Sequence, residues 1–346
     1  MIDWLTLRTP VGALGPALAE RVSACVGRVM CVDADGVLRW QRGYLDLDAL
    51  RSDSVGLYWQ VHGSVTGEPL LVIGGSPASV EYGINVFGSS DVRHCAGVLI
   101  RAASVSLGGV LPGLERWDCR RLDVTENYAL RSASQVRQAL RLLLAADASR
   151  ARPRSMGGDT VGWNVGSDLQ SGKAYAKGPQ LCFLAKRGLA ADVLPWQREL
   201  AASLLRLELK LGSRWWRRRE ANSGAWWELS EAELSALHIG YFGRFIGSME
   251  VVDMGCLLRE LQRVAPTEGQ ALAAHRTWAL VRAVGRDNAR GSMPRATWFR
   301  HVRHLRAAGL SDADLCAGTV VPFRRSVIQL DAPVRSWGEL RAAVLS

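Results

Sequence analysis

Alternation of apolar and polar residues dominates the first two thirds of the chain. It is clearest over residues 204–211, where four leucines alternate with Arg206, Glu208 and Lys210. A period of two is typical of a strand with one buried face. Similar patterns and turn signals predict strands over residues 2–8, 28–40 with an Asp35-Gly36 hairpin turn, 56–63, 69–73, 117–128, 161–164 and 173–181.

The first of these strands has an expected assignment of faces. Strict alternation over residues 2–8 places Ile2 and Trp4 on one face, and Asp3 and Leu5 on the other. The consecutive segments that follow predict antiparallel pairs, because short turns join them.

Helical signals occupy other segments. Ser76 and Pro77 suit the cap and first position of a helix, and Gly83 suits its end. Further helices are predicted over 91–103, 132–145, 194–204, 230–237, 254–264, 268–284 and 294–308. The sequence therefore predicts an α+β protein, with an antiparallel-sheet domain over residues 1–225 and a mainly helical domain over residues 226–346.

Composition narrows the class of protein. A hydrophobic content of 48% excludes overall disorder. There is no apolar run long enough to cross a membrane and no signal-peptide pattern at the start, so we expect no membrane partner and a cytoplasmic location. The seven cysteines form no Cys-x-x-Cys pair, which favours neither a zinc site nor a disulfide framework.

The charge indicates a polyanionic partner. The chain has 43 Lys and Arg against 33 Asp and Glu, a net charge of +10, and most of its cations are arginines. Arginine binds phosphate in a bidentate way, so nucleic acid is the first candidate. A basic protein that is merely soluble is the alternative.

Two basic segments are candidate DNA contacts. In the first, Arg214, Arg217 and Arg218 flank and follow two tryptophans. In the second, Arg295, Arg300 and Arg303 lie on a predicted helix that, with the helix before it, is similar to a helix-turn-helix pair. His301 and His304 of that helix suit phosphate contact better than metal binding. The alternative is a solvated charged face.

Tyr175 and Lys177 are candidate catalytic residues. At positions i and i+2 of a strand their side chains share a face, and a nearby ammonium favours the phenolate. Such a pair suits a tyrosine that attacks a DNA phosphate. A solvated Tyr and Lys on an edge strand is the alternative, and Tyr58, Tyr82 and Tyr128 are rival phenols.

Asp123 and Glu208 are candidate metal ligands. Two carboxylates on different strands can meet across a sheet and hold Mg²⁺ or Mn²⁺, which prefer oxygen ligands. Each lies two residues after an arginine, Arg121 and Arg206, so two cross-strand salt bridges are the alternative.

An ordered series of short motifs resembles the gene II replication initiators of filamentous phages. No single motif is specific for this family, but the order in which the motifs follow one another along the chain is. The matching segments are Met1-Ile2-Asp3, Ser76-Pro77-Ala78, 83–91, Arg121-Leu122-Asp123, 160–164, 174–177, 205–208, Met293-Pro294-Arg295 with Trp298, and 320–322.

The resemblance implies a rolling-circle initiator. Such proteins nick the plus strand of double-stranded phage origin DNA, stay on the 5′ phosphate through a tyrosine and later rejoin the displaced strand, and a host helicase is an expected partner. Tyr175 matches the family's nucleophile, and Asp123 and Glu208 fall where related initiators have metal-binding carboxylates. Ile84 stands where family members often have His, so it receives no role. A non-catalytic origin-binding or regulatory protein is the alternative.

Overall fold

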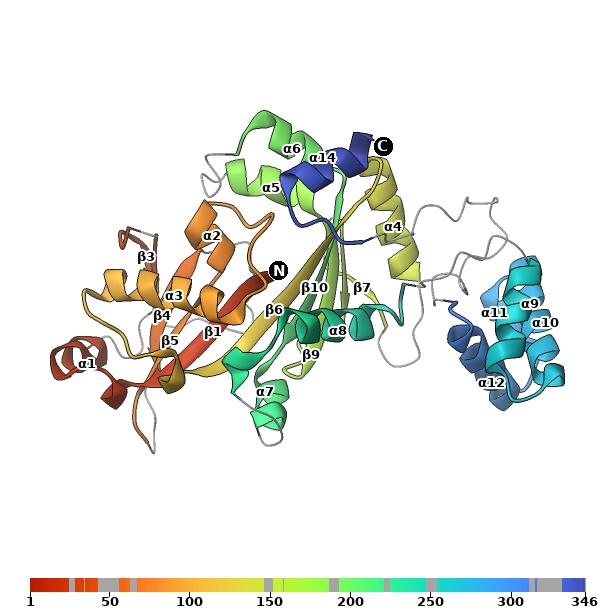
Figure 1. Cartoon of the computed structure of the whole chain (residues 1–346), viewed down its shortest axis with the longest axis horizontal. Coiled ribbons are helices and arrows are strands. Elements are labelled where there is room, and N and C mark those ends of the chain that lie inside the picture. Colours follow the sequence, from red (N-terminus) through yellow and green to blue (C-terminus); the bar gives the residue numbers. More distant parts are fainter. Residues whose placement is uncertain are drawn as a thin grey trace.

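A single antiparallel sheet organises the structure, a computed structural model. The described residues are 1–24, 29–33, 35–42, 56–62, 67–145, 152–157, 159–186, 193–220, 225–246, 254–310, 315 and 332–345. Within them, ten strands form one sheet in the order β3-β2-β4-β5-β1-β6-β10-β9-β8-β7 (Figure 1). The α+β class and the antiparallel pairing predicted from the sequence are confirmed.

The strands follow the predicted segments closely. The Asp35-Gly36 turn joins β2 to β3, and Gly36 has the positive φ of 80° that such a turn favours in glycine. The strands are β1 (Ile2–Pro10), β2 (Val29–Val32), β3 (Leu38–Arg42), β4 (Leu57–His62), β5 (Leu70–Gly75), β6 (Asp118–Ala129), β7 (Arg154–Ser155), β8 (Thr160–Trp163), β9 (Gln170–Ala176) and β10 (Leu204–Leu211).

One face of the sheet is apolar and carries the main core. The alternate leucines of β10 are fully buried there. Helices α3 (Val92–Leu107), α4 (Ala133–Ala145) and α8 (Glu231–Phe242) pack on this face. Gly172 of β9 allows α8 to approach, because a Cβ at this position would lie 2.4 Å from the ring of Tyr241. On the opposite face, the alternate residues of β6, β10 and β9 are polar.

A bulge in β1 corrects the expected faces of the first strand. The pairing of β1 with β6 shifts register between Ile2 and Trp4. An extra residue in one strand reverses the alternation on either side of it. Ile2 therefore joins Leu5 in the main core, Trp4 turns to the other face, and Asp3 forms an ion pair with Arg206.

The strand predicted over 173–181 is too long. β9 ends at Ala176, and Lys177 begins α5 (Lys177–Lys186). Pro179 is compatible with the first turn of a helix but not with a central strand. Gly178 packs against the backbone of Ala202, where a Cβ would lie 2.6 Å from its Cα.

Most predicted helices are confirmed. Ser76 caps α2 by accepting a hydrogen bond from the Ser79 amide, and Gly83 ends the helix in a left-handed conformation. The remaining helices are α1 (Pro16–Ser23), α2 (Pro77–Tyr82), α6 (Pro195–Ala201), α7 (Ser213–Glu220), α9 (Met254–Val264), α10 (Glu268–Val284), α11 (Arg286–Gly291), α12 (Arg295–Ala307) and α14 (Trp337–Leu345), with short 3₁₀ turns η1 (Val11–Ala13), η2 (Leu114–Arg116) and η3 (Trp226–Glu228). None of the helices in the described ranges is long and apolar enough to cross a membrane.

Helices α9 to α12 share an apolar cluster of their own. It includes Leu257, Leu261, Trp278, Trp298 and Leu305, all almost completely buried. Helix α8, in contrast, belongs to the core of the sheet. The division at residues 225 and 226 remains a prediction. The last residue of the sheet's apolar cluster in this region is Ile246, and the first of the second cluster is Leu257.

The chain returns to the sheet after the helical cluster. Val334 and Leu340 pack with Val86, Leu181 and Leu204. The amide of Val334 donates a hydrogen bond of 2.8 Å to the carbonyl of β6 residue Asn127. Helix α14 consequently lies beside α5 and α6 (Figure 1).

The contact between α8 and β10 predicts acid sensitivity. His238 is 1% exposed, and its Nε2 lies 3.1 Å from the carbonyl oxygen of Leu207. Burial lowers the pKa of His238 to about 4, so the folded protein binds fewer protons than the unfolded chain between about pH 4 and 6.5. We expect the contribution of His238 to the free energy of unfolding to fall by on the order of 3 kcal/mol as the pH falls through this window.

The measurement is chemical denaturation of the full chain at several pH values. The comparison is His238→Gln, which keeps a donor for Leu207 but does not titrate. An equal loss of stability in both proteins would assign the acid sensitivity to other groups.

Candidate active site

The polar face of β6, β10 and β9 carries the candidate catalytic residues in rows. The register places Arg206 opposite Asn127 on one side and Tyr175 on the other. The next row pairs Glu208 with Thr125 and Lys173. Directly opposed side chains on one face of a sheet lie in contact distance.

Tyr175 and Glu208 are joined by a short hydrogen bond. The phenol donates to Glu208 Oε1 at 2.5 Å, while Lys173 Nζ lies 3.3 Å from Oε2. Burial and the charge of Glu208 raise the pKa of Tyr175 well above its usual value. Burial alone would raise the pKa of Glu208, but Lys173 and Arg206 outweigh it and lower that pKa to about 2. The site thus holds a neutral phenol whose proton points at an ionised carboxylate.

Arg206 connects this pair to the start of the chain. Its guanidinium is completely buried and donates to Asn127 Oδ1 at 2.8 Å and to Asp3 Oδ1 at 3.2 Å. Both Arg206 and Asn127 also donate to the carbonyl of Val86. Asn85 holds the same Asp3 oxygen at 2.9 Å. The loop after α2 is in this way fixed to the polar face.

Lys177 belongs to the same network but not to the strand of Tyr175. It is completely buried, and its Nζ donates to Asn85 Oδ1 at 2.8 Å. Its charge acts on both carboxylates of the network. Burial and the charge of Glu208 raise the pKa of Asp3 to about 6, whereas Arg206 and Lys177 act in the opposite direction. Lys177 therefore supplies positive charge from the start of α5.

Asp123 is a salt-bridge partner in this structure. It is 1% exposed, and Arg121 donates to its two oxygens at 2.8 and 2.5 Å. The guanidinium of Arg121 also lies 5.3 Å from the ring centroid of Trp4. Asp123 is opposite Lys210 in the register, one row from Glu208. Asp123 is thus in an ion pair, but with an arginine of its own strand rather than across strands, whereas Glu208 does pair across strands with Lys173.

The arrangement does not fit the predicted divalent ion. Both oxygens of Asp123 and both oxygens of Glu208 already accept hydrogen bonds from protein donors. In the described ranges there is also no group of three or more His, Cys, Asp or Glu that could hold a metal ion. Mg²⁺ or Mn²⁺ at these two carboxylates remains a prediction from the sequence.

The rival phenols have different surroundings. Tyr58 is buried and stacks on Trp4, and burial raises the pKa of Tyr128. Tyr82 is 57% exposed at the end of α2. Tyr82 has the carboxylate of Glu81 beside it, at the surface. Tyr175 donates to Glu208, a buried carboxylate that is also paired with Lys173.

The predicted DNA-contacting arginines are on two helices. Arg214, Arg217 and Arg218 are exposed on α7, where Arg214 lies 3.9 Å from Asp168. Arg295, Arg300 and Arg303 are exposed on α12.

The histidines of α12 do not face solvent with its arginines. His301 and His304 are 7% and 8% exposed, and His301 Nδ1 lies 2.7 Å from the hydroxyl of Thr277 on α10. Their expected contact with phosphate is therefore wrong, because the helix presents these positions to its neighbours.

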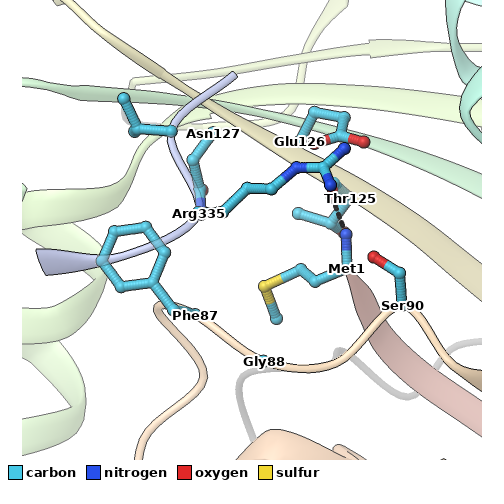
Figure 2. Close-up of a pocket in the computed structure, with 9 residues that line it drawn as sticks. Met1, Phe87, Gly88, Ser90, Thr125, Glu126, Asn127 and Arg335 are labelled. Atoms are coloured by element: carbon cyan, nitrogen blue, oxygen red, sulfur yellow. Dashed lines mark hydrogen bonds between the residues drawn. The ribbon is translucent and has the colours of Figure 1, made fainter. Parts of the chain in front are cut away.

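A small cavity lies beside the network, at the edge of β6. Figure 2 shows that Met1, Phe87 and Arg335 surround it together with Thr125 and Asn127. Its volume of about 30 Å³ is room for a single water molecule. It is too small to hold a nucleotide.

Most of the buried network is not predictable from local sequence patterns. No pattern gives a role to Asp3, Asn85 or Asn127, and Arg206 stands out only as a neighbour of Glu208. One available signal was the occurrence of polar residues inside otherwise apolar strands, since such groups need partners when buried. Their partners are 41 to 203 positions away, which no local pattern reveals.

The comparison with known families identifies the family of the chain. No curated protein matches the chain. The family described as the N-terminal region of the replication-associated gene II protein matches residues 1–230, two thirds of the 346 residues, and this range contains Tyr175, Glu208 and Arg206. The match confirms the resemblance to the gene II initiators. The chain belongs to this family of replication-associated proteins, whose N-terminal region spans the sheet and its polar network.

Proposed function

We propose that the chain is a rolling-circle replication initiator that nicks the plus strand of double-stranded phage DNA at the origin and later rejoins it. The replication role follows from the family. The nicking chemistry rests on one observation, the hydrogen bond from the Tyr175 phenol to the ionised carboxylate of Glu208.

In the proposed step, Tyr175 Oη attacks the scissile phosphorus and its proton passes to Glu208 Oε1. A bond forms between phosphorus and the phenol oxygen, and the bond to the 3′ oxygen breaks. Glu208 passes this proton on to the 3′ oxygen, which leaves as a hydroxyl, while the 5′ phosphate stays on Tyr175. One phosphate ester replaces another, so the reverse reaction rejoins the strand without a nucleotide cofactor.

The surrounding cations favour this step electrostatically. Lys173 and Arg206 flank Glu208 on the polar face, and positive charge stabilises the charge that develops on a transferring phosphoryl group. The side chain of Lys173 is 28% exposed, so it borders solvent. Tyr175 is only 7% exposed, and DNA binding has to make the phenol accessible. This step uses no divalent ion. The ion dependence predicted from the sequence is tested by measuring nicking with and without a chelator.

The decisive experiment uses the purified full chain and a supercoiled duplex that carries the phage origin. Denaturing electrophoresis of a labelled origin strand detects a nick and a covalent adduct, and peptide mapping identifies the residue. A chain that binds the origin but forms no nick and no adduct would support the alternative, a non-catalytic origin-binding protein. We further propose a host helicase as partner and the host cytoplasm as location.

The exposed arginines of α12 are proposed to supply part of the DNA affinity. Replacing Arg300 and Arg303 by alanine should weaken binding and reduce the slope of log affinity against log salt by about one unit for each phosphate that the variant no longer binds. Fluorescence anisotropy at several salt concentrations measures both. Arg137 and Arg141, exposed on α4, provide a control that removes the same charge. An unchanged slope, or an equal change in the control, would leave α12 as a solvated face.

A further inference from the structure

The exposed side of α12 carries an aromatic residue between arginines. Phe299 is 40% exposed. It lies at positions i+4 and i−4 relative to Arg295 and Arg303, so the three side chains form one stripe along the helix. The Arg295 guanidinium lies 5.7 Å from the ring centroid of Phe299, within the range of a cation–π contact.

Phe299 is not part of the apolar cluster that holds this helix. The cluster takes Trp298, Val302 and Leu305 from the adjacent side of α12, about a quarter turn from Phe299. The stripe defined by Arg295, Phe299 and Arg303 is therefore a surface that the packing of the helices does not use. A single exposed apolar residue is common, but here it is set within a row of exposed cations.

The charge around the stripe identifies its partner as a polyanion. Residues 268–310 contain eight arginines against two acids, Glu268 and Asp287, a net charge of +6 with neutral histidines. This is more than half of the net charge of +10 of the whole chain. Such a concentration on one helical group is the electrostatic footprint of nucleic acid.

The dimensions of α12 suit duplex DNA. Its 13 residues make a helix about 20 Å long. The major groove of B-DNA is about 12 Å wide and admits one α-helix. The apolar feature of the base edges in that groove is the methyl group of thymine, whereas the other groups are hydrogen-bond donors and acceptors. A phenyl ring placed on a donor or acceptor would leave it unpaired, at a cost in free energy.

We propose that α12 lies in the major groove of duplex DNA and that Phe299 contacts the methyl group of a thymine. Arg295, Arg300 and Arg303 bind the flanking phosphates. The inference rests on the proposed function in that it takes the duplex around the origin as the partner. It adds a residue that contributes to base specificity rather than to general affinity.

The test begins with selection of preferred sites by the full chain from a random duplex library. Each thymine of the selected site is then replaced by deoxyuridine, which lacks only the methyl group. At one position this replacement should lower the affinity of the wild-type chain by about five- to tenfold. Phe299→Ala should bind the thymine duplex with this lowered affinity, and the replacement by deoxyuridine should not lower it further. The salt slope of Phe299→Ala should equal that of the wild type, because no phosphate-binding group is removed.

Leu272→Ala is the matched control, because Leu272 is 36% exposed on α10 and lies outside the stripe. It should bind as the wild type does, and circular dichroism should show unchanged melting for both variants. The proposal is overturned if no site is selected, if Phe299→Ala binds normally, if it responds to deoxyuridine as the wild type does, or if its loss occurs on single strands alone. Adduct formation at Tyr175, assayed on the same preparations, reports separately on the nicking function.

Discussion

Tyr175→Phe should abolish both nicking and the covalent adduct with origin DNA. The substitution removes the oxygen that attacks phosphorus and leaves the ring, which packs at 7% exposure, in place. The hydrogen bond to Glu208 is removed, but Lys173 and Arg206 still compensate that carboxylate. The protein should therefore fold and bind the origin normally, and the decrease should be as large as the assay can record.

Tyr82→Phe is the matched control, since Tyr82 is an exposed phenol that lies outside the buried network. It should nick and form the adduct at the wild-type rate. Nicking by the Tyr175→Phe protein, or an adduct that maps to Tyr82 or Tyr128, would contradict the assignment of the nucleophile.

Asp123→Asn should lower the free energy of unfolding by about 3 to 5 kcal/mol, the usual cost of leaving one charge of a buried pair uncompensated. Arg121 is 4% exposed and directs two donors at the carboxylate of Asp123. An asparagine side chain carries no charge, and it has one acceptor oxygen where aspartate has two, so it can accept from only one of the two donors. Thermal unfolding at neutral pH, with the wild type alongside, measures the effect.

The double variant Arg121→Met/Asp123→Leu separates the two interpretations of Asp123. Replacing both members of a buried ion pair by apolar residues is often neutral, so a salt-bridge role predicts recovered stability and retained nicking. A metal-ligand role predicts that Asp123→Asn folds normally but does not nick, and that the double variant is equally inactive.

The elements of the sheet could be predicted because their signals are local. In β10 the alternation of leucines with Arg206 and Glu208 reports directly on one buried face and one polar face. The end of β9 was misjudged because Lys173, Tyr175 and Lys177 continue the same period of two. The signal that contradicts a strand beyond Ala176 is Gly178-Pro179, because proline cannot continue a central strand.

The candidate site was predictable only in part. Residue type identified Tyr175 and Glu208, but not that the phenol donates to the carboxylate, because that contact depends on the register of β9 against β10. The bulge at the start of β1 brings Asp3 to Arg206, and the bulge leaves no trace in the alternation itself. Asp123 shows the same limit, since an arginine two residues before it fits either a ligand or an ion pair.

The return of the chain to the sheet at α14 has a consequence for synthesis on the ribosome. Ile246 is the last residue in the main core of the sheet, and Val334 follows it 88 positions later in the chain. At roughly 5 to 20 residues per second, translation of that interval takes roughly 4 to 18 s. During this time Val86, Leu181 and Leu204 lack the apolar partners that Val334 and Leu340 later provide. The nascent sheet should be a client for chaperones until α14 has emerged and docked.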